Sequence, residues 1–136
     1  MELTHRIDVA SGRKPADLVF KNVSFVNVFT NTIEEGDVAI AGTHIAGIGS
    51  YQGREEVDLK GQILCPGFID GHVHIESSML NVPEFARTVV TRGTTAVIAD
   101  PHELANVMGA EGIRFILRNS KYCPIHVYVM LSSCVP

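Results

Sequence analysis

The sequence predicts an α/β fold, with a β-rich segment over residues 1–64 and alternating strands and helices over residues 65–136. In the second part, strand-like and helix-like stretches alternate with short connections, which is typical of parallel strands joined by right-handed crossovers. In the first part, several short strands are separated by closely spaced turns, which favours a small sheet or sandwich. Polar and titratable residues gather where each apolar strand of the second part stops, so these ends are candidates for a functional site.

The first part opens with residues 1–15, a lead-in expected to be partly helical or strapped onto the surface. β-Branched and aromatic side chains then favour strands. Turns are expected at residues 30–32 and 34–37, and a tight hairpin at residues 41–44. The expected strands cover residues 18–29, 38–40, 45–48, 57–59 and 63–64.

In the second part, apolar residues recur at helical spacing in the stretches between three apolar runs. Asn81 and Pro83 predict the start of a helix that Gly93 ends, with Phe85, Ala86, Val89 and Val90 on its apolar face. Residues 101–109 form a loop or short helix. Residues 110–119 have a clearer helical pattern than residues 101–109, and Ile113, Ile116 and Leu117 are expected on the inner side of that helix. The expected strands cover residues 68–74, 94–100 and 125–131.

Composition excludes several classes of protein. The net charge of −4 argues against a nucleic-acid-binding surface, which is normally basic. The sequence has no uncharged apolar run of about 18 residues, so no membrane span is expected. It has three cysteines, without a Cys-x-x-Cys motif or a visible signal peptide. An odd number of cysteines in that context indicates reduced thiols in a cytoplasmic protein.

The most informative motif is His72-Val-His74, at the end of the apolar run that begins at residue 68. Residues two apart in a strand share a face, so Asp70, His72 and His74 are expected to form one polar row. Two imidazoles placed in this way can bind one metal ion, and a neighbouring carboxylate can orient them. The motif therefore predicts half of a metal site.

Three separated stretches, residues 66–79, 100–103 and 132–136, resemble the metal-dependent amidohydrolases, and most closely the branch of that family that deaminates adenine. Residues 66–74 resemble the first barrel strand of the family. Residues 74–79, His-Ile-Glu-Ser-Ser-Met, and residues 100–103, Asp-Pro-His-Glu, resemble the adenine-deaminating branch, as do residues 132–136, Ser-Ser-Cys-Val-Pro. The resemblance covers nearly the whole chain, and the three motifs stand in the expected order, which makes it far more specific than His-x-His alone.

The resemblance implies a fold larger than this chain. A (β/α)8 barrel needs about 200 residues or more. Residues 65–136 are therefore expected to supply its first three βα units, with the remaining strands beyond Pro136. Residues 1–64 are expected to form part of a small β-sandwich domain that residues after the barrel complete.

The resemblance also implies chemistry. A pair of divalent ions, manganese or iron with zinc as the alternative, would activate water for attack on C6 of adenine, giving hypoxanthine and ammonia. The small molecule adenine is the expected partner, and a homo-oligomer is the expected form of the complete enzyme. The expected roles are metal binding for His72 and His74, catalysis for His102 and Glu103, and substrate binding for Glu76, Ser77, Ser78 and Asp100.

Several alternatives stay open. Residues 76–78 could equally form a capped loop, and His102 and Glu103 could bind substrate, move a proton or cap a short helix. The enzyme could instead be another cyclic amidohydrolase, acting on a hydantoin, an imidazolone or an N-acetyl sugar, although residues 76–78 argue against this. The third hypothesis is a non-catalytic truncated barrel that serves as an interaction module.

Overall fold

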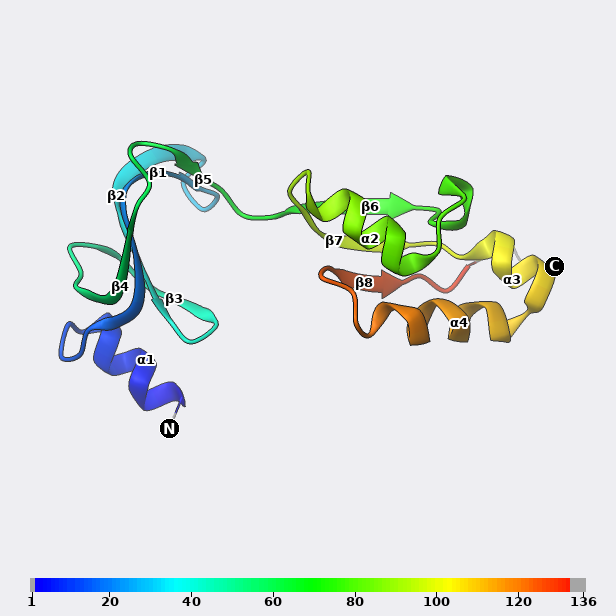
Figure 1. Cartoon of the computed structure of the whole chain (residues 1–136), viewed down its shortest axis with the longest axis horizontal. Coiled ribbons are helices and arrows are strands. Elements are labelled where there is room, and N and C mark those ends of the chain that lie inside the picture. Colours follow the sequence, from blue (N-terminus) through cyan, green and yellow to red (C-terminus); the bar gives the residue numbers. More distant parts are fainter. Residues whose placement is uncertain (1, 133–136) are drawn as a thin grey trace. The chain divides into compact units, whose positions relative to one another are not determined.

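The computed structural model describes residues 2–132 (Figure 1). The chain divides into two compact units, Met1–Pro66 and Gly67–Pro136, which are described separately below.

The first unit is a five-stranded mixed sheet preceded by one helix. The strand order is β3-β2-β1-β4, and β5 also pairs with β1. β2 runs antiparallel to β1 and β3, whereas β4 and β5 run parallel to β1. The elements are α1 (Glu2–Ala10), β1 (Ala16–Asn27), β2 (Thr32–Ala41), β3 (His44–Gly49), β4 (Gly53–Asp58) and β5 (Ile63–Leu64).

Local sequence explains most of this unit. The lead-in forms α1, as expected of a partly helical segment, and buries Val9. The expected hairpin joins β2 to β3, with Gly42 at a φ of 60° that glycine adopts without strain. The turn expected at residues 34–37 is wrong, because β2 continues through it and Gly36 pairs with Val23. Antiparallel pairing along β1 thus overrides the local turn preference of a Glu-Glu-Gly-Asp sequence.

The second unit is a three-stranded parallel sheet in the order β6-β7-β8. A buried apolar cluster joins α2 and α4 to the same face of this sheet (Figure 1). The members of that cluster include Phe85, Ala86, Val97, Ala99 and Ile116. The elements are β6 (Phe68–Val73), the 3-10 turn η1 (Glu76–Ser78), α2 (Val82–Val90), β7 (Thr94–Ala99), α3 (His102–Met108), α4 (Ala110–Ser120) and β8 (His126–Val129).

The helices of this unit follow their sequence signals closely. The Asn81 side chain caps α2 by accepting a hydrogen bond from the backbone N–H of Glu84 (3.0 Å). In α4, Ile116 is buried as expected, but Leu117 is 45% exposed, so its predicted inward position is wrong. Gly112 is buried in its place and lies close to the backbone of Leu104. Close approach of α3 thus turns the Gly112 and Ile116 face inward and Leu117 outward.

Within residues 2–132, no helix is both long enough and apolar enough to cross a membrane.

Candidate metal centre

The polar residues of the second unit meet at the carboxyl ends of its three strands. β6 leads into His74 and η1, β7 leads into Asp100 and the start of α3, and β8 leads toward Ser132. In a parallel sheet these ends lie along one edge, and in β/α barrels that edge carries the chemistry. The hydrogen bonds described below join all three ends, as the sequence predicted.

The two imidazoles of the His-x-His motif face each other. The Nε2 atoms of His72 and His74 are 3.1 Å apart, and the two rings meet edge to face at 72°. The His72 side chain is exposed and His74 is half-buried. Asp70 contacts the backbone, because its Oδ1 accepts a hydrogen bond from the backbone N–H of His72 (3.1 Å). The carboxylate therefore helps to fix the backbone that carries the pair.

The backbone carbonyl of Asp100 decides the tautomer of His74. It lies 2.8 Å from His74 Nδ1, and a carbonyl oxygen only accepts hydrogen bonds, so Nδ1 carries the proton. In the neutral ring, Nε2 then keeps its lone pair and points it toward His72. Metal-binding histidines in proteins are commonly held by such a carbonyl on the remote nitrogen.

This donor set fits a divalent transition metal. Two nitrogens bound to one tetrahedral zinc ion lie about 3.3 Å apart, because each Zn–N bond is about 2.0–2.1 Å. The observed 3.1 Å between the two Nε2 atoms needs only a small adjustment. Asp100 is the third residue whose donor atoms lie close to both histidines. The described residues thus offer two well-placed nitrogens and one nearby carboxylate.

His102 and Glu103, at the start of α3, form a second group with His74. Glu103 Oε2 lies 3.2 Å from His74 Nδ1 and 3.7 Å from His102 Nε2, and the His74 and His102 ring centroids are 4.6 Å apart. These three side chains could also share a metal ion. Burial works to raise the pKa of Glu103, but hydrogen bonds, including one from Ser77, and the nearby His102 lower it overall. Glu103 is therefore set up to stay ionised beside the two rings.

Two of the three residues of η1 hydrogen-bond to α3. The Ser77 hydroxyl donates to Glu103 Oε1 (3.0 Å), and Glu76 Oε1 accepts from the backbone N–H of Leu104 (3.4 Å). The Ser78 hydroxyl donates to the carbonyl of Ile75 (2.6 Å) and so caps its own turn. Ser77 thus contacts Glu103, a member of the histidine group, whereas Ser78 makes the contacts of the capped-loop alternative.

Asp100 is the most deeply placed acidic residue of the site, with 8% of its surface exposed. Its Oδ1 accepts from the Ser132 hydroxyl, and its Oδ2 lies 3.4 Å from His102 Nδ1. The hydrogen bond from the Ser132 hydroxyl lowers the pKa of Asp100 from its ordinary value of 3.8. Burial opposes this shift, and the hydrogen bond with the His102 ring adds to it. The carboxylate is thus charged and linked to two other residues of the site.

Sequence reasoning missed two of these contacts. It placed Ser132 at the third strand end without a role, and it did not include the backbone carbonyl of Asp100. A serine just after the third strand, near the end of the neighbouring strand that leads to Asp100, was the available signal for the first, but no side-chain pattern reveals a backbone acceptor. Ser133 and Cys134, which belong to the same motif as Ser132, lie outside the described residues.

Comparisons with known proteins place the chain in a family. Residues 63–136 match the amidohydrolase family. The adenine deaminase of Clostridium acetobutylicum is 53% identical over 134 residues, which cover 98% of this chain and 24% of that protein. The adenine deaminases of Geobacillus kaustophilus and Archaeoglobus fulgidus are 54% and 50% identical over 98% and 99% of this chain. The chain spans about a quarter of the length of these curated relatives.

Solved structures show the same fold at lower identity. A D-aminoacylase, described for the role of its binuclear metal center, matches with a TM-score of 0.66 at 20% identity, over 87% of this chain and 30% of its own. The L-hydantoinase of Arthrobacter aurescens matches with a TM-score of 0.54 at 22% identity, over 64% of this chain and 21% of its own. At these identities the likeness establishes an α/β amidohydrolase fold and nothing about substrate.

Proposed function

Because this chain belongs to the amidohydrolase family, we propose that it is part of an enzyme that hydrolyses adenine to hypoxanthine and ammonia. Relatives named adenine deaminase are about half identical to it over almost its whole length. The observation that carries the proposal is the facing pair of Nε2 atoms of His72 and His74, 3.1 Å apart at a strand end. That pair is suited to hold the ion that a metal-dependent hydrolase requires.

We further propose that residues 65–136 supply the first three βα units of a (β/α)8 barrel. Three parallel strands with crossover helices support this, since a barrel repeats that unit eight times. The face of the sheet opposite α2 and α4 would line the barrel interior. In this proposal the polar strand ends described above form one sector of the mouth of the barrel.

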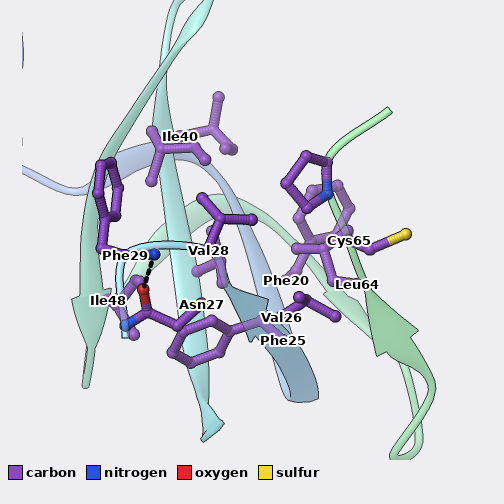
Figure 2. Close-up of a pocket in the computed structure, with 13 residues that line it drawn as sticks. Phe20, Phe25, Val26, Asn27, Val28, Phe29, Ile40, Ile48, Leu64 and Cys65 are labelled. Atoms are coloured by element: carbon purple, nitrogen blue, oxygen red, sulfur yellow. Dashed lines mark hydrogen bonds between the residues drawn. The ribbon is translucent and has the colours of Figure 1, made fainter. Parts of the chain in front are cut away.

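Residues 1–64 would then belong to a small β-sandwich domain. One face of the five-stranded sheet is hollowed into an apolar pocket of about 340 Å³, which Figure 2 shows with Phe20, Phe25, Val28 and Phe29 among its lining residues. Phe29 is 97% exposed, and large exposed apolar patches are uncommon on isolated domains. Such a face supports a second layer packed on this sheet in the complete protein.

A divalent ion bound by His72 and His74 would lower the pKa of a water molecule and so supply a nucleophile near neutral pH. Manganese or iron is proposed, with zinc as the alternative, and the binuclear metal center of the D-aminoacylase supports a second ion. The chain's own contribution is orientation, because Asp100 holds the His74 ring with Nε2 free. Residues outside this chain would complete the ligand set.

His102 and Glu103 are proposed to handle protons during the reaction. An ionised Glu103 carboxylate beside the His102 ring can accept a proton and pass it on, and proton transfer of this kind typically contributes about 10²–10⁴-fold to rate. The substrate-binding role proposed for Glu76, Ser77, Ser78 and Asp100 is best supported for Ser77, which lies beside Glu103. The other three would have to release present contacts or bind adenine through a remaining lone pair.

Two further proposals concern the complete enzyme. Three cysteines without a Cys-x-x-Cys motif support a reducing, cytoplasmic setting. A homo-oligomer is proposed from the family resemblance alone. Adenine is the only partner we propose, and the net charge of −4 does not favour nucleic acid.

The test is a substrate panel on the complete gene product. Adenine, guanine, hydantoin, an imidazolone and an N-acetyl sugar would be supplied to enzyme loaded with manganese, iron or zinc, and ammonia, the expected hypoxanthine and ring-opened or deacylated products would be quantified. Turnover of adenine alone supports the proposal. Turnover of hydantoin, an imidazolone or an N-acetyl sugar in preference to adenine would replace it with a cyclic amidohydrolase, and a metal-free protein inactive on all substrates would favour the interaction module.

A further inference from the structure

Asp100 uses every one of its polar groups to join the three strand ends. Its backbone N–H donates to the carbonyl of Val73 (2.9 Å), and its own carbonyl accepts from His74 Nδ1 (2.8 Å). Its carboxylate accepts from the Ser132 hydroxyl on one oxygen and faces His102 Nδ1 on the other (3.4 Å). Every polar group of Asp100 thus already has a partner within the site.

The Asp100 carboxylate fixes the tautomer of the His102 ring, just as the Asp100 carbonyl fixes the tautomer of the His74 ring. A carboxylate beside Nδ1 favours the tautomer with the proton on Nδ1, which leaves the lone pair of neutral His102 on Nε2. That nitrogen lies 3.7 Å from Glu103 Oε2. The direction in which His102 offers its lone pair therefore depends on how the Asp100 carboxylate is held.

Ser132 is the group that holds it. Asp100 is only 8% exposed, so few water molecules can hydrogen-bond to its carboxylate. Ser132 is its hydrogen-bond donor from the β8 side. The backbone brings Ser132 to this edge, because Met130, two residues earlier, donates its N–H to the carbonyl of Ala99 (2.8 Å). Removing the hydroxyl would leave Oδ1 buried without that donor, so the carboxylate would turn toward another donor and away from His102.

We propose that Ser132 is a positioning residue for His102, acting through the carboxylate of Asp100. This inference rests on the proposed function of the same site and adds a residue to it. The hydrogen bond of Ser132 is to Asp100 and not to His72 or His74, the two facing imidazoles. Among the described residues it also makes no hydrogen bond to Ser77, the best-supported substrate residue, so its loss should reduce turnover while metal and adenine still bind.

The kinetic test compares Ser132→Ala, Ser132→Thr and the control Ser120→Ala in the complete metal-loaded enzyme. Ser120 is a half-buried serine whose hydroxyl donates to the carbonyl of Leu117 (3.0 Å) at the end of α4, before β8 begins. Ser132→Ala should lower kcat by about tenfold to a hundredfold, the usual effect of losing an orienting partner, with KM within about twofold. Ser132→Thr keeps the hydroxyl and should restore most of kcat, and Ser120→Ala should match the wild type.

Three outcomes overturn the inference. Ser132→Ala could have the wild-type kcat, its kcat could fall only in proportion to a loss of bound metal, or Ser132→Thr could be as slow as Ser132→Ala. Crystal structures of the wild type and Ser132→Ala give a second readout that needs no activity. The His102 Nδ1 to Asp100 Oδ2 contact should be present in the first and lost in the second, and an unmoved His102 ring contradicts the inference. If the wild type does not deaminate adenine, the proposed function fails, while these structures still decide the role of Ser132.

Discussion

The imidazole of His74 and the backbone carbonyl of Asp100 are joined by a 2.8 Å hydrogen bond across the ends of β6 and β7. That bond places the proton on Nδ1 and directs the lone pair of Nε2 at His72. It also makes the proposed metal site depend on parallel pairing of two strands, since Asp100 is held to β6 by its own N–H. The orientation of the proposed ligand His74 is thus fixed by sheet register.

His74→Ala should strongly weaken metal binding in the complete enzyme, because it removes one of the two facing nitrogens, the one whose lone pair the Asp100 carbonyl orients. We expect loss of most bound metal and a fall in adenine turnover of at least about a hundredfold, as the activated water depends on the ion. Metal content measured by mass spectrometry, together with ammonia release, checks this. His126→Ala, at the start of β8 and stacked on Tyr128, is the matched control and should keep both.

Glu103→Gln should reduce kcat by about 10²-fold or more while the enzyme stays folded. The amide keeps an oxygen for Ser77 but loses the charge that faces His74 and His102. Steady-state kinetics with adenine measure the effect. Glu84→Gln, on the exposed surface of α2 where Glu84 pairs with Arg87, should behave as wild type. Equal kcat for both variants would rule out a catalytic role for Glu103.

Ile116→Ala should destabilise the second unit by about 2–5 kcal/mol, the usual cost of truncating a fully buried aliphatic side chain. Ile116 is 1% exposed and belongs to the cluster that joins α4 to the sheet. Leu117→Ala, its exposed neighbour, should cost less than about 1 kcal/mol. Urea unfolding of the 136-residue chain followed by circular dichroism measures the two free energies of unfolding.

Asp37→Asn should destabilise the first unit at pH 7 and have little effect near pH 2. Lys21 donates to Asp37 (2.7 Å), which lowers the pKa of that carboxyl from its ordinary value of 3.8. A lowered folded-state pKa stabilises the fold above the unfolded value, and this contribution disappears as pH falls through the folded value. Thermal unfolding of both forms between pH 7 and pH 2 should show the two melting temperatures converge below pH 3.8.

The 136-residue chain alone should release no ammonia from adenine and bind metal weakly. Its strand ends offer two facing imidazoles and nearby carboxylates, whereas residues outside this chain are proposed to complete the ligand set. An ammonia assay with added manganese, iron or zinc, beside the complete gene product as positive control, checks this. Robust turnover by the purified chain would contradict it.

Much of the second unit was predictable because its signals are local. Asn81 and Pro83 mark a helix start, and the apolar run from residue 94 to residue 99 ends at Asp100, as in the structure. The β2 turn prediction failed because strand pairing with β1 outweighs a short turn-like sequence. Leu117 was misplaced because helical periodicity alone does not show that α3 packs on Gly112.

The sequence by itself determined which residues reach the strand ends, since a period of two puts Asp70, His72 and His74 on one face and apolar runs stop where polar groups begin. Only the tertiary structure decided which atoms meet. The carbonyl of Asp100 selects the His74 tautomer, and Ser132 reaches Asp100 from a strand 32 residues away. Parallel pairing creates these contacts, and a backbone acceptor or a partner from another strand leaves no pattern in the local sequence.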